Sequence, residues 1–120
     1  MGSRQRRGSL LAVCFLCLPL LAWPRDVGTV TLVDHRGADF QLASLRGSGV
    51  LLVFGFTHCP HICPVEMARV SAALRELQAA QQPVQAVFVT VDPGRDSPDV
   101  IGAYLENFQP GIIGLTGTAE

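Results

Sequence analysis

Two apolar runs, separated by one amphipathic segment, constrain the fold of this chain more than any other feature. The runs cover residues 50–56 and 84–91, and neither contains a charged residue. Such runs are typical of strands that are covered on both faces, as in a parallel sheet. Between them, apolar residues recur at spacings of three, four and three, at Met67, Val70, Leu74 and Leu77. This spacing predicts a helix that begins at Pro64, since proline suits a first helical turn.

A second helix and a third strand follow in the same order. Ser97 and Pro98 form a typical N-cap and first helical residue, and apolar side chains continue to Phe108. The other elements that we expect are a β-hairpin over 28–40, a helical turn over 43–45 and a strand over 112–115. Strands that alternate with helices predict an α/β fold, with a parallel sheet and right-handed crossovers.

The junction between the first apolar run and the first helix carries two cysteines, Cys59 and Cys63. The free amides and dipole of a helix N-terminus favour thiolate, the form that attacks disulfides and binds soft metals. At a spacing of four on one helical face, the Cβ atoms lie roughly 5–6 Å apart. The pair therefore indicates either a redox-active dithiol, able to close a disulfide, or a metal site. Three intervening residues favour the metal site, with Cu(I) ahead of zinc.

Three histidines are further candidates at this site. His61 lies between the two cysteines and is the candidate for an additional metal ligand, and His58 is a weaker one. His35 falls in the expected hairpin turn, where we expect it to face solvent. The loop after the second apolar run carries three charged residues, Asp92, Arg95 and Asp96. They either flank the thiols at the carboxyl edge of the sheet or form a local turn, and the turn is favoured.

The first 24 residues have the composition of a targeting segment. Three arginines precede an uncharged apolar stretch over 10–23, which predicts a signal peptide or an uncleaved membrane anchor. Residues 25–120 then form one domain outside the cytoplasm, where Cys59 and Cys63 can cycle between dithiol and disulfide. Cys14 and Cys17 lie inside the apolar stretch, and we interpret them as small hydrophobic residues.

The charge balance of the domain excludes one class of partner. Beyond residue 24 the chain has six arginines and ten acidic residues, a net charge of −4, and it contains no lysine. A mildly acidic domain without a basic stripe argues against nucleic-acid binding.

Three ordered segments resemble the signatures of the Sco/SenC family. Residues 55–64, GFTHCPHICP, resemble the family's copper motif, while 88–98 and 104–118 resemble its second and third signatures. The resemblance implies a thioredoxin-like, membrane-anchored copper chaperone, in which Cys59 and Cys63 are the two thiolate ligands. The expected ion is Cu(I), with Cu(II) as the alternative. Its recipient would be the copper-bearing subunit of cytochrome c oxidase or another copper protein. Its location would be the periplasmic side of the inner membrane or the mitochondrial intermembrane space.

The chain departs from the family pattern in two ways. His61 stands where family members commonly carry an acidic residue, and the family's third ligand, a histidine, lies beyond the region matched here. The closing strands and helix of the thioredoxin-like core are missing too, so we expect an incomplete domain, which is a fragment, a truncated gene product or the product of a split reading frame. The 50–56 strand should then present an unpaired apolar edge, and the isolated domain should be unstable or aggregate.

Two alternatives to the copper chaperone stay open from the sequence. One is a thiol–disulfide oxidoreductase that reduces cysteines of a partner, with Cys59 as the attacking thiol and Cys63 as its partner. The other is a truncated remnant without function. The sequence therefore leaves open whether the protein is an enzyme.

Overall fold

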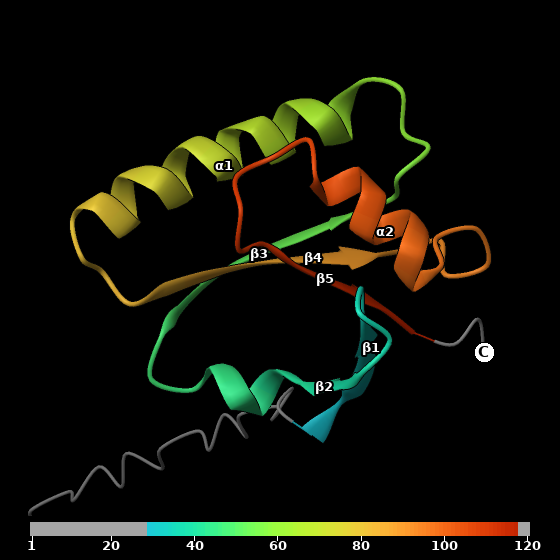
Figure 1. Ribbon diagram of the computed structural model, residues 1–120, viewed down its shortest axis with the longest axis horizontal. Helices are drawn as coiled ribbons and strands as arrows, with labels where there is room; N and C mark the ends of the chain where they lie inside the picture. The colour runs from blue at the N-terminus through green and yellow to red at the C-terminus, as the bar shows by residue number, and fades with distance from the viewer. Residues whose placement is uncertain (1–28, 118–120) are drawn as a thin grey trace, which may run out of the picture.

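The computed structural model describes residues 29–117, which form a mixed sheet with two helices (Figure 1). The elements are, in chain order, β1 (Thr31–Asp34), β2 (Asp39–Gln41), the short 3-10 helix η2 (Leu42–Leu45), β3 (Gly49–Gly55), α1 (Ile62–Ala79), β4 (Val84–Thr90), α2 (Pro98–Leu105) and β5 (Ile113–Thr116). Over these residues the strand order is β2-β1-β5-β4-β3. β3, β4 and β5 are parallel, which confirms the expected alternation of strands and helices. The targeting segment predicted over 1–24 lies outside the described residues.

The N-terminal hairpin joins the parallel strands through β1, which runs antiparallel to β5. Its turn is stabilised by Asp34, whose Oδ1 accepts from the backbone N–H of Arg36 and Ala38, both at 2.9 Å. The expectation that His35 faces solvent is wrong. Its side chain is half-buried, and its Nδ1 accepts from the backbone N–H of Gly114 at 3.1 Å. His35 therefore ties the hairpin to β5.

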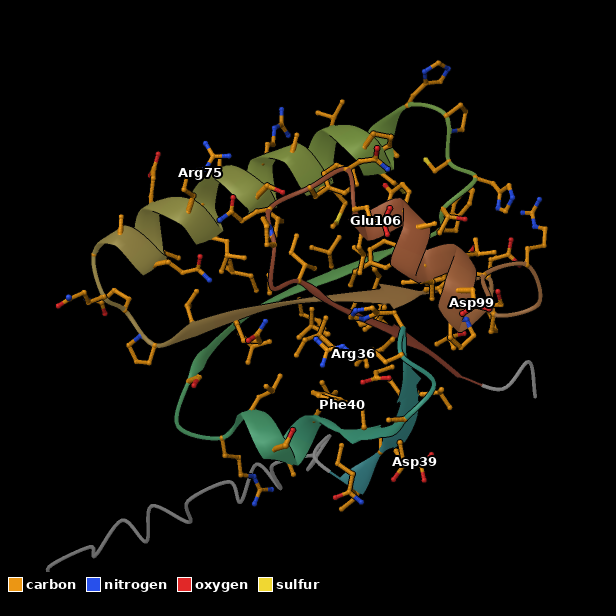
Figure 2. All side chains as sticks on the ribbon, in the orientation of Figure 1. Arg36, Asp39, Phe40, Arg75, Asp99 and Glu106 are labelled. Carbon is orange, nitrogen blue, oxygen red and sulfur yellow. The ribbon has the colours of Figure 1, made fainter. Side chains whose placement is uncertain are left out.

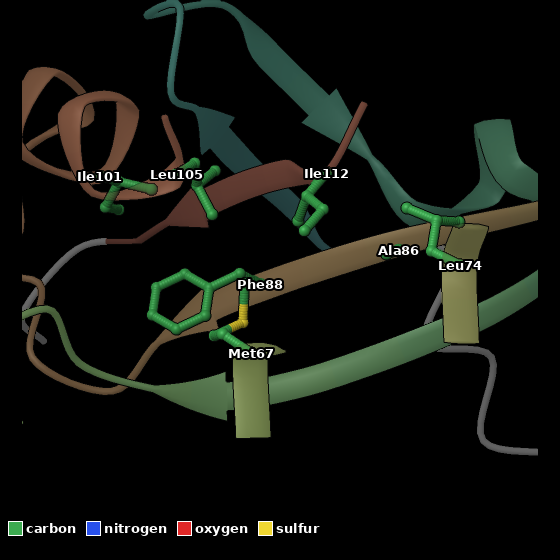
Figure 3. Packing of buried hydrophobic residues seen from close by; sticks show 7 residues of the cluster. All are labelled: Met67, Leu74, Ala86, Phe88, Ile101, Leu105 and Ile112. Atoms are coloured by element: carbon green, nitrogen blue, oxygen red, sulfur yellow. The ribbon is translucent and has the colours of Figure 1, made fainter. Parts of the chain in front are cut away.

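Both helices pack on the same face of the sheet and share one core. The core combines side chains from α1, β4, α2 and the approach to β5: Met67, Leu74, Ala86, Phe88, Ile101, Leu105 and Ile112 (Figure 3). Phe88 is fully buried, and its ring lies beside Met67 in Figure 3. The charged side chains of the helices stay outside this core, and Arg75, Asp99 and Glu106 are exposed (Figure 2).

The opposite face of β3 is open within the described residues. Leu51 and Val53 pack against the core, but Val50, Leu52 and Phe54 are 41%, 44% and 64% exposed. The prediction that both faces are covered is therefore wrong for the 50–56 run within residues 29–117, where β3 lies at the edge of the sheet. It is confirmed for the 84–91 run at Val87, which is 1% exposed between the helix-facing Ala86 and Phe88. The predicted unpaired edge is confirmed within residues 29–117, since β3 is the last strand of the sheet and pairs with β4 alone.

No helix within residues 29–117 is long and apolar enough to cross a membrane. The membrane anchor suggested by the sequence belongs to the N-terminal segment outside this range.

Candidate dithiol site

Cys59 and Cys63 lie where β3 passes into α1, at the carboxyl end of the parallel strands. The helix begins at Ile62, two residues before the predicted start at Pro64. Cys63 therefore lies in the first helical turn, and Cys59 lies in the loop that precedes it. Both residues are 9% exposed, so the pair is largely buried.

Cys59 faces the free amides of the helix N-terminus. The backbone N–H of Cys63 donates to the Cys59 Sγ at 3.5 Å, within the range of a sulfur acceptor. This amide, then the Cys63 side chain and the amides of His61 and Ile62, lower the pKa of Cys59 to about 7. These amides would otherwise be unpaired, since the first turn of a helix has no internal acceptors for them. The geometry therefore supplies the thiolate that the sequence predicts at this position.

Cys63 has the opposite environment. A Cβ atom added to Gly55 would lie 3.2 Å from the Cys63 Sγ and 3.0 Å from the Phe88 ring, so the sulfur sits tightly between strand and core. Burial raises the pKa of Cys63, and the nearby Cys59 and Asp96 add to this rise. The two thiols are thus distinct: one ionises readily and the other holds its proton. Both are reduced in this structure, and a Cys59–Cys63 disulfide stays a prediction.

The loop after β4 contributes a buried carboxylate to the site. Asp96 is fully buried and accepts from the backbone N–H of Thr57 at 2.9 Å and from its hydroxyl at 2.6 Å. The Thr90 hydroxyl also donates to it, at 2.6 Å. Burial raises the pKa of Asp96, but these hydrogen bonds outweigh it and hold the pKa below its usual value. The favoured explanation of this loop as a plain turn holds for Asp92 and Arg95, which form a local ion pair, and is wrong for Asp96.

Tyr104 of α2 lies near the site, and nothing in the sequence pattern connects it with the thiols. Its ring packs against Phe88 and Phe108, with centroid distances of 5.6 and 5.1 Å. Its hydroxyl is buried and, among the described residues, has no hydrogen-bond partner. Burial, followed by the charges of Cys63 and Cys59, raises its pKa to about 12. The Tyr104 hydroxyl is therefore protonated at neutral pH. It is a hydrogen-bond donor near the dithiol without an acceptor among the described residues.

Comparison with known proteins confirms the family that the three segments resemble. The SCO1/SenC family model matches residues 24–120. The chain belongs to this family. Among curated Sco relatives, it is 47% identical over 95 residues to the mitochondrial SCO2 homolog of Bos taurus, which covers 78% of this chain and 36% of that protein. It is 45% identical over 94 residues to the mitochondrial SCO2 of Saccharomyces cerevisiae, covering 78% and 31%. The chain thus spans about a third of the length of these relatives.

Solved Sco structures confirm the thioredoxin-like fold at partial coverage. Copper-bound yeast Sco1 matches with a TM-score of 0.70 at 42% identity, over 73% of this chain and 56% of that one. Copper-bound ScoI of Arabidopsis thaliana matches with a TM-score of 0.70 at 37% identity, over 77% and 58%. BsSco, described as a cytochrome c oxidase assembly protein with a disulfide switch, matches at 0.67 and 29%, over 75% and 54%.

The histidines do not complete a larger donor set in the described part of this Sco chain. His61 is exposed and occupies the N-cap of α1, where its side chain makes no capping hydrogen bond. The His58 side chain is 53% exposed, and its Nδ1 lies 3.5 Å from Asp96. Residues 29–117 contain no group of three or more histidine, cysteine or acidic residues placed to hold a metal ion. Metal ligation by Cys59, Cys63 and His61 stays a prediction.

Proposed function

We propose that this chain binds Cu(I) through its Cys-x-x-x-Cys pair and delivers it to a copper protein, with the copper-bearing subunit of cytochrome c oxidase as the recipient. The observation that carries the proposal is the pair of adjacent thiols at a helix N-terminus, one of which ionises near neutral pH. Soft thiolate ligands select Cu(I), whereas a structural zinc site uses four protein ligands. The copper-bound Sco relatives support the same cargo.

The donor set suits a carrier that must both hold and release its cargo. Cys59 already ionises near pH 7, while Cys63 must lose its proton when the metal binds. Two protein sulfurs leave room for a third donor, which His61 or a group of the recipient supplies. We further propose that the domain works outside the cytoplasm and is attached through residues 1–24, in line with the mitochondrial relatives and a lipoprotein of this family in Bacillus anthracis.

A Cu(I) titration tests this function. The reduced chain, titrated against a chelator of known Cu(I) affinity, should bind one equivalent, and both Cys59→Ser and Cys63→Ser should lose it. The matched control is the Cys14→Ser/Cys17→Ser double variant, which removes the leader thiols and should bind copper like the parent. Equal copper retention in Cys59→Ser and Cys63→Ser would rule the proposal out. The Cu(I) affinity of His61→Ala is measured in the same way. A lower affinity would assign His61 as a ligand, and an unchanged affinity would exclude it.

A second candidate function is thiol–disulfide exchange, and the difference between the two thiols favours it. The Cys59 thiolate attacks one sulfur of a partner disulfide, which forms a mixed disulfide and releases one partner thiolate. The Cys63 sulfur, after losing its proton, then attacks Cys59, so that the pair is oxidised by two electrons and the partner leaves as a dithiol. A mixed disulfide trapped in Cys63→Ser and absent in Cys59→Ser would support this function. Its absence from both variants would contradict it.

A further inference from the structure

Asp96 is the one fully buried charged side chain among residues 29–117, and both of its carboxylate oxygens are engaged. Oδ1 accepts from the Thr57 hydroxyl and lies 3.5 Å from the His58 Nδ1. Oδ2 accepts from the Thr57 backbone N–H and from the Thr90 hydroxyl. Burying an ionised carboxylate is costly, so such a group needs hydrogen bonds or a counter-charge to be retained.

The counter-charge near Asp96 is weak, so hydrogen bonds stabilise the buried carboxylate instead. Arg95, its neighbour in sequence, pairs with Asp92. His58 is close enough, but it carries a charge only when it is protonated. The carboxylate therefore depends on three donors from two strand ends, two from Thr57 after β3 and one from Thr90 at the end of β4.

These contacts join the loop after β3 to two segments on either side of the β4–α2 loop. Thr57 lies 39 positions from Asp96 and only two before Cys59. Ser97, directly after Asp96, caps α2 by accepting from the Val100 backbone N–H. One carboxylate thus connects the loop that carries Cys59 with the end of β4 and with the start of α2.

We propose that Asp96 is a positioning residue for Cys59: it fixes Thr57, and thereby holds the Cys59 sulfur against the amides at the start of α1. The loop between β3 and α1 turns at this point, since the Cys59 backbone N–H donates to the Phe56 carbonyl at 3.2 Å. Thr57 lies inside that turn. Its two hydrogen bonds to Asp96 therefore fix the orientation of the backbone that leads to Cys59. The role rests on the proposed function only in taking Cys59 as the reactive thiol.

The experiment compares the two thiols within one molecule. The reduced, copper-free chain is alkylated with iodoacetamide at one pH near neutrality, and mass spectrometry of the peptides gives the rate at each cysteine. Asp96→Ala should lower the Cys59 rate, and with it the ratio of the Cys59 rate to the Cys63 rate, about tenfold. A fall in the ratio that comes from a faster Cys63 alone reports the loss of the Asp96 charge, since that charge raises the pKa of Cys63, and counts against positioning. Thr57→Val, which removes only the hydroxyl, should lower the ratio less, and Thr57→Ser, which keeps the hydroxyl, should restore the parent ratio.

A matched control separates positioning from stability. Ile101→Val trims a buried side chain of α2 and lowers stability without touching the loop at Cys59. It should leave the ratio at the parent value. If Asp96→Ala and Ile101→Val lower the melting temperature and both leave the ratio unchanged, Asp96 has a structural role alone and the proposal is wrong. If Asp96→Ala does not fold, an unchanged ratio in Thr57→Val overturns the proposal equally.

The outcome is distinct from that of the copper test. Alkylation is measured without metal, so the ratio reports on Asp96 whether or not the chain binds Cu(I). If the parent chain fails to bind Cu(I), the copper function is refuted. If Asp96→Ala still lowers the ratio of the Cys59 and Cys63 alkylation rates through a slower Cys59, the positioning role is supported.

Discussion

The two faces of the sheet differ in how completely the described residues cover them. On the helix side, Ala86 and Phe88 of β4 are inaccessible to solvent under α1 and α2. On the other side, Leu52 and Phe54 of the neighbouring strand β3 remain exposed. The same kind of apolar sequence thus has two environments. The open one is confined to the edge strand β3, since Val87 of β4 and Leu115 of β5, which alternate with the helix-facing residues, are 1% and 0% exposed.

The largest predicted effect on stability distinguishes two phenylalanines, Phe88 and Phe54, which lie on opposite faces of the sheet. Phe88→Ala should lower the free energy of unfolding by about 3–5 kcal/mol, because it empties a closed core. Phe54→Ala should change it by about 0.5 kcal/mol, because Phe54 is 64% exposed. Urea denaturation followed by circular dichroism gives both values. Similar losses for the two variants would show that the face of Phe54 is covered.

The next effect tests how tightly the helix side is packed. A Cβ added to Gly114 would lie 2.2 Å from Ile101 and 2.8 Å from Leu105, so α2 approaches β5 more closely than any other residue there allows. Gly114→Ala should therefore cost about 1–3 kcal/mol of stability through overpacking. Gly94→Ala is the matched control, since nothing lies within 4 Å of its added Cβ. Equal melting temperatures for the two variants would contradict close packing between α2 and β5.

Much of the helix side was predictable from the sequence, because period and capping act locally. The spacing of Met67 and Leu74 predicted α1, and Ser97 with Pro98 predicted the start of α2, which the structure confirms. The position of the thiols at a strand–helix junction was predictable for the same reason.

The unpredicted features depend on contacts between distant segments. A wholly apolar run does not reveal which of its faces finds a cover, so the exposure of Phe54 was missed. Asp96 looked like a turn residue because its partner Thr57 lies 39 positions away and carries no charge. His35 was likewise placed in solvent because nothing in the sequence pairs it with Gly114. The hydroxyls at the ends of both strands, Thr57 after β3 and Thr90 as the last residue of β4, were the signal that could have found the buried carboxylate.

The two thiols extend the comparison to two environments within one site: backbone amides stabilise a thiolate at Cys59, whereas Cys63 is tightly packed against Gly55. The pKa of Cys59 is lowered to about 7, so its thiolate fraction, and with it its alkylation rate, should rise through pH 7 and level off above it. The pKa of Cys63 is raised, so this thiol should remain largely unreactive until the pH exceeds the ordinary value for cysteine. Peptide-resolved alkylation from pH 5 to pH 10 measures both curves in one sample. Overlapping curves would contradict the split between the thiols.

The substitution with the smallest expected effect on stability, Phe54→Lys, should change the self-association of the chain. Phe54→Lys places a charge on the open face of an edge strand that has no charge of its own, and such residues are what edge strands use against intermolecular pairing. The free energy of unfolding should change by about 0.5 kcal/mol, while light scattering should show less self-association.

Val65→Lys is the matched control for this last test, because Val65 is 48% exposed on α1, away from the edge. It adds the same charge, so solubility gained from net charge alone should appear in both variants. A reduction confined to Phe54→Lys identifies β3 as the surface through which copies associate. Equal scattering in the two variants would mean that the exposed apolar face of β3 is not the source of association. A large loss of stability in Phe54→Lys would mean that a segment outside residues 29–117 covers that face.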